Sequence, residues 1–150
     1  MIAVVQRVHS AEVVVESKSV SKIGKGYLVL LGCDKDDALS DAEYIAKKLI
    51  NLRVFSDEDD KMNLSINDIG GEMIIVSQFT LLAKTRKGNR PSFTDAKEPD
   101  EADKLYMSVV EMVKSAGIKT GTGIFGANMD VSLVNGGPVT IILNSKDTRK

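Results

Sequence analysis

The stretch Met73-Ile74-Ile75-Val76-Ser77-Gln78-Phe79-Thr80-Leu81-Leu82 decides how the rest of the chain is interpreted. Its apolar first half is typical of a strand that is covered on both faces. If the strand continues, alternation places Gln78 and Thr80 on one face, about 7 Å apart. A buried polar group without a partner costs about 1–3 kcal/mol, so this strand end is expected to be solvated, internally hydrogen-bonded or open to a ligand. The simplest alternative is that Ser77 and Thr80 only cap a strand end.

The composition is that of an ordinary globular protein, and the length suits one domain, residues 1–150. A single cysteine, Cys33, and a single histidine, His9, exclude an internal disulfide, a cysteine-based zinc site and a histidine-rich metal site. The start lacks the pattern of a signal peptide, and no apolar run approaches the roughly 20 residues of a membrane span. We therefore expect a cytoplasmic protein without a membrane partner. The net charge of −1 gives no global attraction to nucleic acid, so such a partner would need a local patch.

The segment before the central stretch predicts several strands and one helix. The expected strands are residues 2–8, 11–16, 19–23 and 27–31, with His9-Ser10 as a tight connection between the first two. Arg7 falls inside the first strand, where an arginine usually faces solvent. Ser40-Asp41-Ala42-Glu43 has the pattern of a capping box and predicts a helix with Ser40 as N-cap that ends near Asn51. The apolar face of this helix consists of Ala42, Ile45, Ala46 and Leu49.

Two charged segments flank the central stretch. A short strand is expected at residues 53–55, and the four acids at 57–60 follow it. These acids lack the spacing and the bidentate glutamate of a calcium loop, so we expect a solvated turn. After the central stretch, four of seven residues are cationic: Lys84, Arg86, Lys87 and Arg90. This segment is either an exposed mobile loop or a loop that contacts phosphates.

The last third predicts a second helix and two strands. Pro99 can begin a helix, whose apolar stripe runs from Ala102 to Ala116, and Gly117 suits its C-terminal end. The glycines at 121–126 match neither the dinucleotide nor the P-loop spacing. Strands are expected around residues 129–133 and 139–143, separated by Asn135-Gly136-Gly137-Pro138. Because proline cannot donate to a strand ladder, Gly137-Pro138 is either a plain turn or a bend whose cis bond aims two carbonyls the same way.

Five segments together resemble the D-aminoacyl-tRNA deacylase family. Two are like its signature motifs: Ser77-Gln78-Phe79-Thr80-Leu81 and Gly137-Pro138-Val139-Thr140. The others are Val5-Gln6-Arg7-Val8, Arg90-Pro91-Ser92-Phe93 and Phe125-Gly126-Ala127. All five stand in the family's order across residues 1–145, which is far more specific than any one of them. The chain departs from the family at Gly136, where an acidic residue is common.

The resemblance implies an α/β fold, with a compact barrel-like mixed β-sheet subunit and two main helices, that works as a homodimer. It implies a hydrolase that cleaves D-aminoacyl-tRNA, and glycyl-tRNA charged in error, in translational proofreading and quality control. The partner is then the aminoacylated 3′ end of tRNA and not DNA, and no cofactor or metal is expected.

The resemblance also assigns residues to roles. Catalysis falls to Ser77, Gln78, Phe79 and Thr80. Gly137 and Pro138 enter the partner subunit's site and exclude L-amino acids, and Arg7 braces their turn instead of facing solvent. The adenosine pocket consists of Phe125, Gly126 and Met129. The expected phosphate contacts are Lys84, Arg86, Lys87 and Arg90.

The chemistry itself narrows the mechanism. Attack of water on an aminoacyl ester creates an oxyanion, and the Phe79 and Thr80 amides with the Thr80 hydroxyl are available donors. A nucleophilic Thr80 would need a nearby base, and the motif offers none. Three alternatives remain: a non-catalytic tRNA 3′-end-binding module, an interaction protein whose motifs serve only dimer packing, and a thiol enzyme that uses Cys33.

Overall fold

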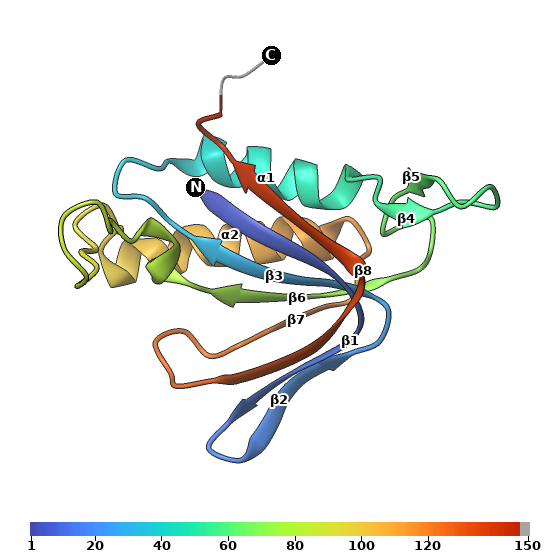
Figure 1. Cartoon of the computed structure of the whole chain (residues 1–150), viewed down its shortest axis with the longest axis horizontal. Helices are drawn as coiled ribbons and strands as arrows, with labels where there is room; N and C mark the ends of the chain where they lie inside the picture. Colours follow the sequence, from blue (N-terminus) through green and yellow to red (C-terminus); the bar gives the residue numbers. More distant parts are fainter. Residues whose placement is uncertain (148–150) are drawn as a thin grey trace.

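The computed structural model describes residues 1–147, and residues 148–150 of the expected domain lie outside that range. Figure 1 shows a curled sheet with two helices on one side. The elements, in chain order, are β1 (Ile2–Val15), β2 (Lys18–Ile23), β3 (Gly26–Gly32), α1 (Leu39–Asn51), β4 (Phe55–Ser56), β5 (Met62–Leu64), β6 (Glu72–Ser77), a 3-10 helix η1 (Phe79–Leu82), α2 (Pro99–Ser115), β7 (Thr120–Thr122) and β8 (Asp130–Asn144).

The long strand β1 joins two parts of one six-stranded sheet. The sheet runs in the order β2-β1-β3-β6-β7, and β8 pairs with β1 along almost its whole length. The first half of β1 lies between β8 and β3, and its second half lies between β8 and β2. The pairs β3–β6 and β6–β7 are parallel, and the other pairs in this sheet are antiparallel. The expected mixed, barrel-like α/β fold with two main helices is confirmed.

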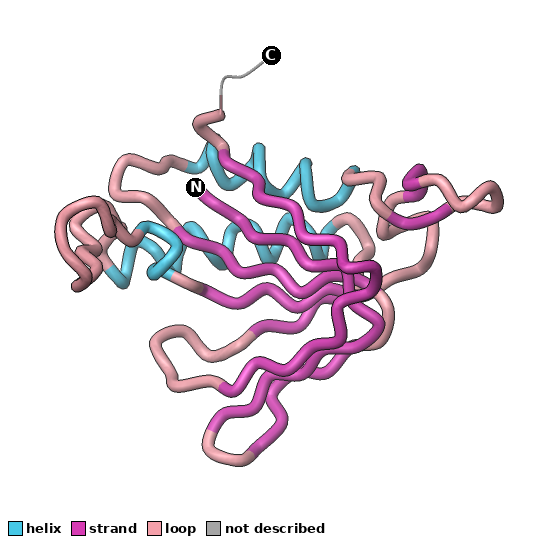
Figure 2. Tube along the Cα trace, viewed as in Figure 1, coloured by secondary structure: helices cyan, strands magenta, loops and turns pink. Residues whose placement is uncertain are grey.

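Contact between β2 and β7 draws the sheet towards closure. The Ser21 hydroxyl on β2 donates a hydrogen bond to the Thr122 carbonyl on β7 at 2.5 Å. The tube in Figure 2 shows the two helices stacked beside one face, while β2, the second half of β1 and the first half of β8 curl away from them. None of the described helices is long and apolar enough to cross a membrane.

Strand β6 lies between two hydrophobic cores, which explains its unbroken apolar sequence. Met73 and Ile75 point into the core between the sheet and the helices. Ile74 and Val76 point into a second core inside the curl of the sheet. Because strand residues alternate between faces, both sets are removed from water, as the sequence predicted. The helix residues Ala42, Ile45, Ala46 and Leu49 are also buried as expected.

Two predicted strand breaks are wrong. His9-Ser10 is not a turn, because β1 continues through both residues, and Asn135–Pro138 does not divide β8. Both places are bulges at which the β1–β8 register shifts. A bulge disrupts the alternation of side chains while the neighbouring strand holds the chain extended. The sequence pattern therefore ended each strand too early.

The predicted start of α1 is also wrong. The helix begins at Leu39 with Ala38 as N-cap, and the Asp41 carboxylate accepts a hydrogen bond from the Ala38 amide at 2.9 Å. Asp41 is thus the acid that reaches back, in place of Glu43. The strand expected at residues 53–55 is shorter and lies at Phe55–Ser56. The solvated acidic turn is confirmed, with the Asp57 carboxylate accepting the amides of Asp59 and Lys61.

Candidate active site

The polar motif at the end of β6 forms a turn of 3-10 helix. The strand stops at Ser77, so the strand alternation that was expected to place Gln78 and Thr80 on one face does not continue through them. The Gln78 amide donates to the Leu31 carbonyl at 2.8 Å, after which the chain bends across β3. A Cβ at Gly32 would lie 2.9 Å from the Gln78 carbonyl oxygen, so only glycine permits this approach. The bend exposes Phe79 and Thr80 and leaves Gln78 half-buried.

Gln78 and Thr80 hydrogen-bond each other despite the end of the strand. The Gln78 Nε2 donates to the Thr80 Oγ1 at 2.5 Å. Phe79 and Thr80 open the short helix, so their amides fall at its N-terminal end, where no carbonyl of the helix itself can accept them. The motif therefore presents a hydroxyl and two amides on one exposed turn.

A cavity of about 640 Å³ opens beside this turn. The residues that line it include Ser77, Gln78 and Phe79 of the motif, together with Phe125, Gly126 and Met129. The structure thus brings together two of the predicted groups, although Thr80 itself is not among the lining residues. The Phe93 ring meets the Phe79 ring edge-on at 5.1 Å between centroids, which extends the aromatic wall.

The cavity contains no acid or imidazole that could act as a base. Of the described residues, none that lines it is histidine, aspartate or glutamate. Within residues 1–147, no group of three or more metal-binding side chains is present. Cys33 lines the cavity, but burial, together with the charge of Asp37, raises the pKa of its thiol to about 11. A protonated thiol without a nearby imidazole is a poor nucleophile, which disfavours a thiol enzyme.

The Gly137-Pro138 turn lies far from the cavity of its own chain. Gly137 and Pro138 are exposed, and the peptide bond between them is cis. The turn lies opposite Arg7, which pairs with Tyr27, whereas Ser77 pairs with Leu31 at the other end of β3. Four residues of strand separate the two levels by about 13 Å. Figure 1 shows the bend of β8 and the end of β6 at opposite ends of the sheet.

Arg7 holds the backbone of this turn from below. Its Nε donates to the Gly136 carbonyl at 2.7 Å, and its Nη1 donates to the Val54 carbonyl at 2.6 Å. The solvent-facing interpretation of Arg7 is therefore wrong, because Arg7 is half-buried and its guanidinium hydrogen-bonds both the β8 turn and the Val54 carbonyl in the loop before β4. Asn135, which was not among the predicted site residues, closes the turn by accepting the Val139 amide at 2.8 Å. Its place directly before a Gly-Gly pair was the available signal.

The four cations of the basic loop fall into two groups. Lys84 forms an ion pair with Asp95 at 2.6 Å, and its backbone pairs with Ser92, so it closes the base of the loop. Arg86, Lys87 and Arg90 are exposed and form no ion pair within residues 1–147. These three side chains are available to an anionic partner.

Comparison with known proteins places the chain among tRNA deacylases. Residues 4–144 match the family described as D-Tyr-tRNA(Tyr) deacylase. The D-aminoacyl-tRNA deacylase of Desulfatibacillum aliphaticivorans is 58% identical over 146 residues, which cover 97% of this chain and 100% of that protein. The protein of the same name from Thermosipho africanus is 57% identical, with coverage of 97% and 98%.

Two solved structures are similar along nearly the whole chain. One is titled "c-Myc DNA Unwinding Element Binding Protein", with 41% identity, a TM-score of 0.89 and coverage of 96% of this chain and 98% of that one. The other is titled as a probable eukaryotic D-amino acid tRNA deacylase, with 18% identity, a TM-score of 0.80 and coverage of 95% and 97%. The second likeness shows the fold alone.

Proposed function

The chain belongs to the D-aminoacyl-tRNA deacylase family and is a hydrolase of that kind, and from this premise we propose how its parts divide the work. One observation carries the proposal: the motif at the end of β6 and the Phe125–Met129 segment line a single cavity. Its volume of about 640 Å³ falls within the range of ligand pockets, roughly 300–1,000 Å³. This cavity would hold the terminal adenosine of tRNA with the amino acid ester beside Thr80.

Catalysis rests on hydrogen-bond donors and not on a protein nucleophile. An aminoacyl ester is already activated, and attack by water places a negative charge on the former carbonyl oxygen. The Phe79 and Thr80 amides and the Thr80 hydroxyl stabilise that charge, and one such donor is worth about 3–4 kcal/mol. Because no described side chain of the cavity is an acid or imidazole, the ribose 2′-hydroxyl of the substrate positions or activates the water. Ser77 and Gln78 hold the turn in place.

The adenine ring packs against Phe125, Gly126 and Met129, which line the same cavity as the motif. An aromatic ring and a thioether give a base a flat, polarisable contact that does not depend on sequence. Arg86, Lys87 and Arg90 contact phosphates farther along the acceptor arm. Lys84 has a supporting role, since its ammonium is already paired with Asp95.

Chirality is checked by a second copy of the chain. Gly137 and Pro138 are exposed and about 13 Å along the sheet from their own motif, so they can complete only a partner's site. Their carbonyls hold the substrate amino group and leave no room for an L side chain. Exclusion by contact does not read the side chain, so D-amino acids of many kinds and glycine pass. We place this activity in cytoplasmic proofreading of translation.

The decisive experiment charges tRNA with D-tyrosine, L-tyrosine or glycine and follows ester hydrolysis by the purified protein. We expect hydrolysis of the D and glycyl esters and survival of the L ester, with the protein dimeric in sedimentation analysis. Equal hydrolysis rates for the D and L esters would contradict the steric exclusion of L-amino acids. Binding of tRNA without hydrolysis would favour a 3′-end-binding module, and a Gly137→Ala variant that changes assembly but not turnover would favour a packing role alone.

A further inference from the structure

The only histidine of the chain lies against the Gly137-Pro138 turn. A Cβ built on Gly136 would lie 2.9 Å from the His9 Cε1 and 3.0 Å from its Nε2. Such distances are shorter than van der Waals contact allows, so the edge of the imidazole occupies the place of a side chain at position 136. His9 is an exposed residue whose imidazole makes no hydrogen bond or ion pair within the described part of the chain, so its contact with Gly136 is one of packing.

Two side chains of β1 cover two consecutive glycines of β8. The imidazole of His9 covers Gly136, and the guanidinium of Arg7 covers Gly137, where a Cβ would lie 2.9 Å from Nη2. Gly137 has φ +142, so a side chain there would also strain the backbone. The absence of Cβ atoms at both positions therefore lets Arg7 and His9 approach the main chain directly.

The strand register explains why His9 is in position to do this. Val8 pairs with Asn135 and Ser10 pairs with Val134, so His9 is an extra residue on β1 without a partner on β8. Directly beside it, the four residues 136–139 of β8 stand opposite the single residue Arg7, because Gln6 pairs with Thr140 and Val8 with Asn135. The two bulges face each other. A bulge re-aims its side chain, and here it turns the imidazole onto the extruded backbone.

We propose that His9 is a positioning residue for chirality checking: its imidazole and the Arg7 guanidinium together fix the direction in which Gly137 and Pro138 project. This inference rests on the proposed function, in which the turn enters a partner's cavity. No imidazole lines the cavity itself, so His9 would act on the site only through the turn that it supports. The inference assigns the ring a steric role, because the ring edge lies where the Cβ of a side chain at position 136 would be.

The test is a double-mutant cycle of His9→Ala, Gly136→Ala and the double variant, with the ratio of D- to L-tyrosyl-tRNA hydrolysis as the readout. His9→Ala should lower the ratio about tenfold, since misplacing a positioning group by an ångström costs up to about a hundredfold. Gly136→Ala should lower it similarly, because the methyl group displaces the ring. The double variant should be no worse than His9→Ala, because the methyl then occupies vacated space. If the losses caused by His9→Ala and Gly136→Ala instead multiplied in the double variant, the two positions would act independently and the proposal would be overturned.

Two further variants separate shape from chemistry and from general damage. His9→Phe keeps a planar ring over Gly136 and should retain the ratio, and a loss equal to that of His9→Ala would overturn the steric role. Ser10→Ala, at the exposed next position of β1, should leave the ratio and the melting temperature unchanged. A purely structural effect would lower the melting temperature without moving the D-to-L ratio, and that outcome also overturns the proposal.

A third measurement distinguishes failure of this inference from failure of the proposed function. Gly137→Ala tests the turn itself: if it lowers the ratio and His9→Ala does not, the inference fails and the proposed function stands. If neither variant changes the ratio, the Gly137-Pro138 turn is not the chiral filter, and both the proposed filter and this inference fail. The proton NMR signal of the single imidazole reports the contact without catalysis. It should shift in Gly136→Ala, and an unchanged signal would overturn the contact.

Discussion

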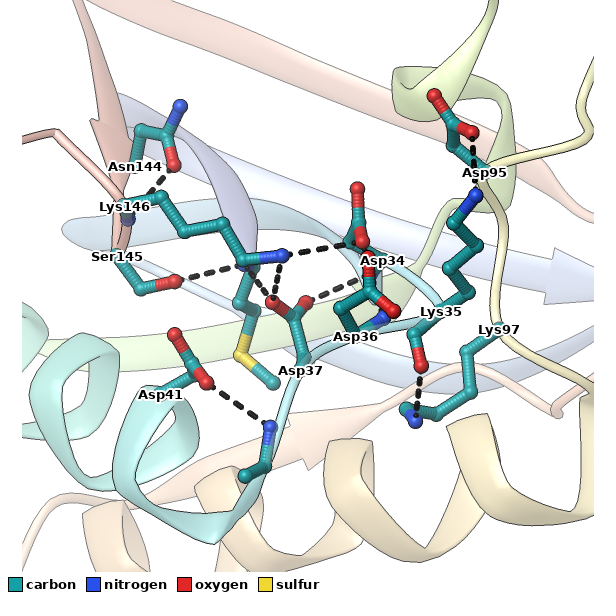
Figure 3. Close-up of polar contacts among 12 residues, drawn as sticks. Asp34, Lys35, Asp36, Asp37, Asp41, Asp95, Lys97, Asn144, Ser145 and Lys146 are labelled. Carbon is teal, nitrogen blue, oxygen red and sulfur yellow. Dashed lines mark hydrogen bonds and ion pairs between the residues drawn. The ribbon is translucent and has the colours of Figure 1, made fainter.

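Two clusters of polar contacts join distant parts of this chain, and they differ in how much of their surface remains exposed to solvent. At the first, the Met1 ammonium lies 2.6 Å from Asp37 and 2.7 Å from the Ser145 hydroxyl, with the side chains of Met1 and Asp37 fully buried. Lys146 adds contacts to Asp37 and Asp34 at 3.3 and 3.1 Å (Figure 3). At the second, Arg7 and Asn135 hold a turn whose outer residues, Gly137 and Pro138, remain exposed.

The difference separates stability from function. The Met1–Asp37 cluster satisfies all its charges within one chain, so its loss affects folding and leaves substrate contacts unchanged. The Gly137-Pro138 turn is held rigidly from one side and presents its other side to solvent, so it is prepared for another molecule. Variants of the first cluster should therefore change the free energy of unfolding, and variants of the second region and its cavity should change turnover.

The largest effect is expected for Asp37→Asn. Removing this carboxylate leaves the Met1 ammonium buried without its counter-charge, which costs about 3–5 kcal/mol of unfolding free energy. Urea denaturation measures it, and the folded fraction should keep its turnover number. The matched control is Asp36→Asn, an exposed acid of the same loop, which should stay within about 0.5 kcal/mol. Equal losses for the two variants would show that the buried pair contributes little.

Thr80→Ala should show the opposite pattern. Thr80 is exposed, so stability should not change, but turnover should fall about a hundredfold to a thousandfold, since one oxyanion donor is removed and two amides remain. Single-turnover hydrolysis of D-tyrosyl-tRNA measures it, with Ser115→Ala at the end of α2 as the control. Complete inactivation, or an acyl group trapped on Thr80, would indicate a covalent mechanism instead.

Variants of the basic loop, residues 84–90, test whether the surface that contacts tRNA extends beyond the cavity. Removing Arg86, Lys87 and Arg90 together should flatten the slope of log affinity for tRNA against log salt by about one unit for each phosphate that is no longer neutralised. Lys84→Ala should change this slope less, because its ammonium is paired with Asp95. Filter binding over a salt series measures both. A slope that none of the four cations alters would leave the segment as an ordinary exposed loop.

The smallest effect concerns the pH dependence of the buried cluster. Burial opposes ionisation of Asp34, but the Asp36 amide and the Lys146 ammonium hold the pKa of Asp34 below its usual value. A lowered pKa contributes stability above the unfolded pKa and loses it as the pH falls through the folded value, below about pH 4. Asp34→Asn should therefore lower the melting temperature at pH 7 and match the parent at pH 2. The difference should be below about 1 kcal/mol, because the pair is partly solvated.

The sequence predicts elements whose burial follows a regular period, and it misses those that depend on distant partners. Strand β6 is covered on both faces and reads as a continuous apolar run, whereas α1 and α2 each bury one face and show the helical period, so the sequence pattern identified all three. β1 and β8 were each divided at a bulge, because His9 and Asn135–Pro138 interrupt the alternation. Pairing between strands more than a hundred residues apart keeps them continuous, and no local pattern reports such a pairing.

The site was predicted unevenly for the same reason. Ser77, Gln78 and Thr80 were visible because polar residues interrupt an apolar strand. The Phe125–Met129 segment has no local feature that places it beside them, and only the resemblance to a family did so. The role of His9 was not visible, because it depends on a contact with Gly136, which is 127 positions away (136 minus 9) along the chain.

The burial of the Met1 ammonium has a practical consequence for chemical labelling. In an unfolded chain the α-amine is the most easily acylated amine at neutral pH, since its pKa is about 7.7–8.0 and that of lysine is about 10.4. Beneath Asp37 and Ser145 it is inaccessible, so a reagent should modify the exposed lysines first. The rate at which the Met1 amine is modified would then report how often the region around Met1, Asp37 and Ser145 opens locally.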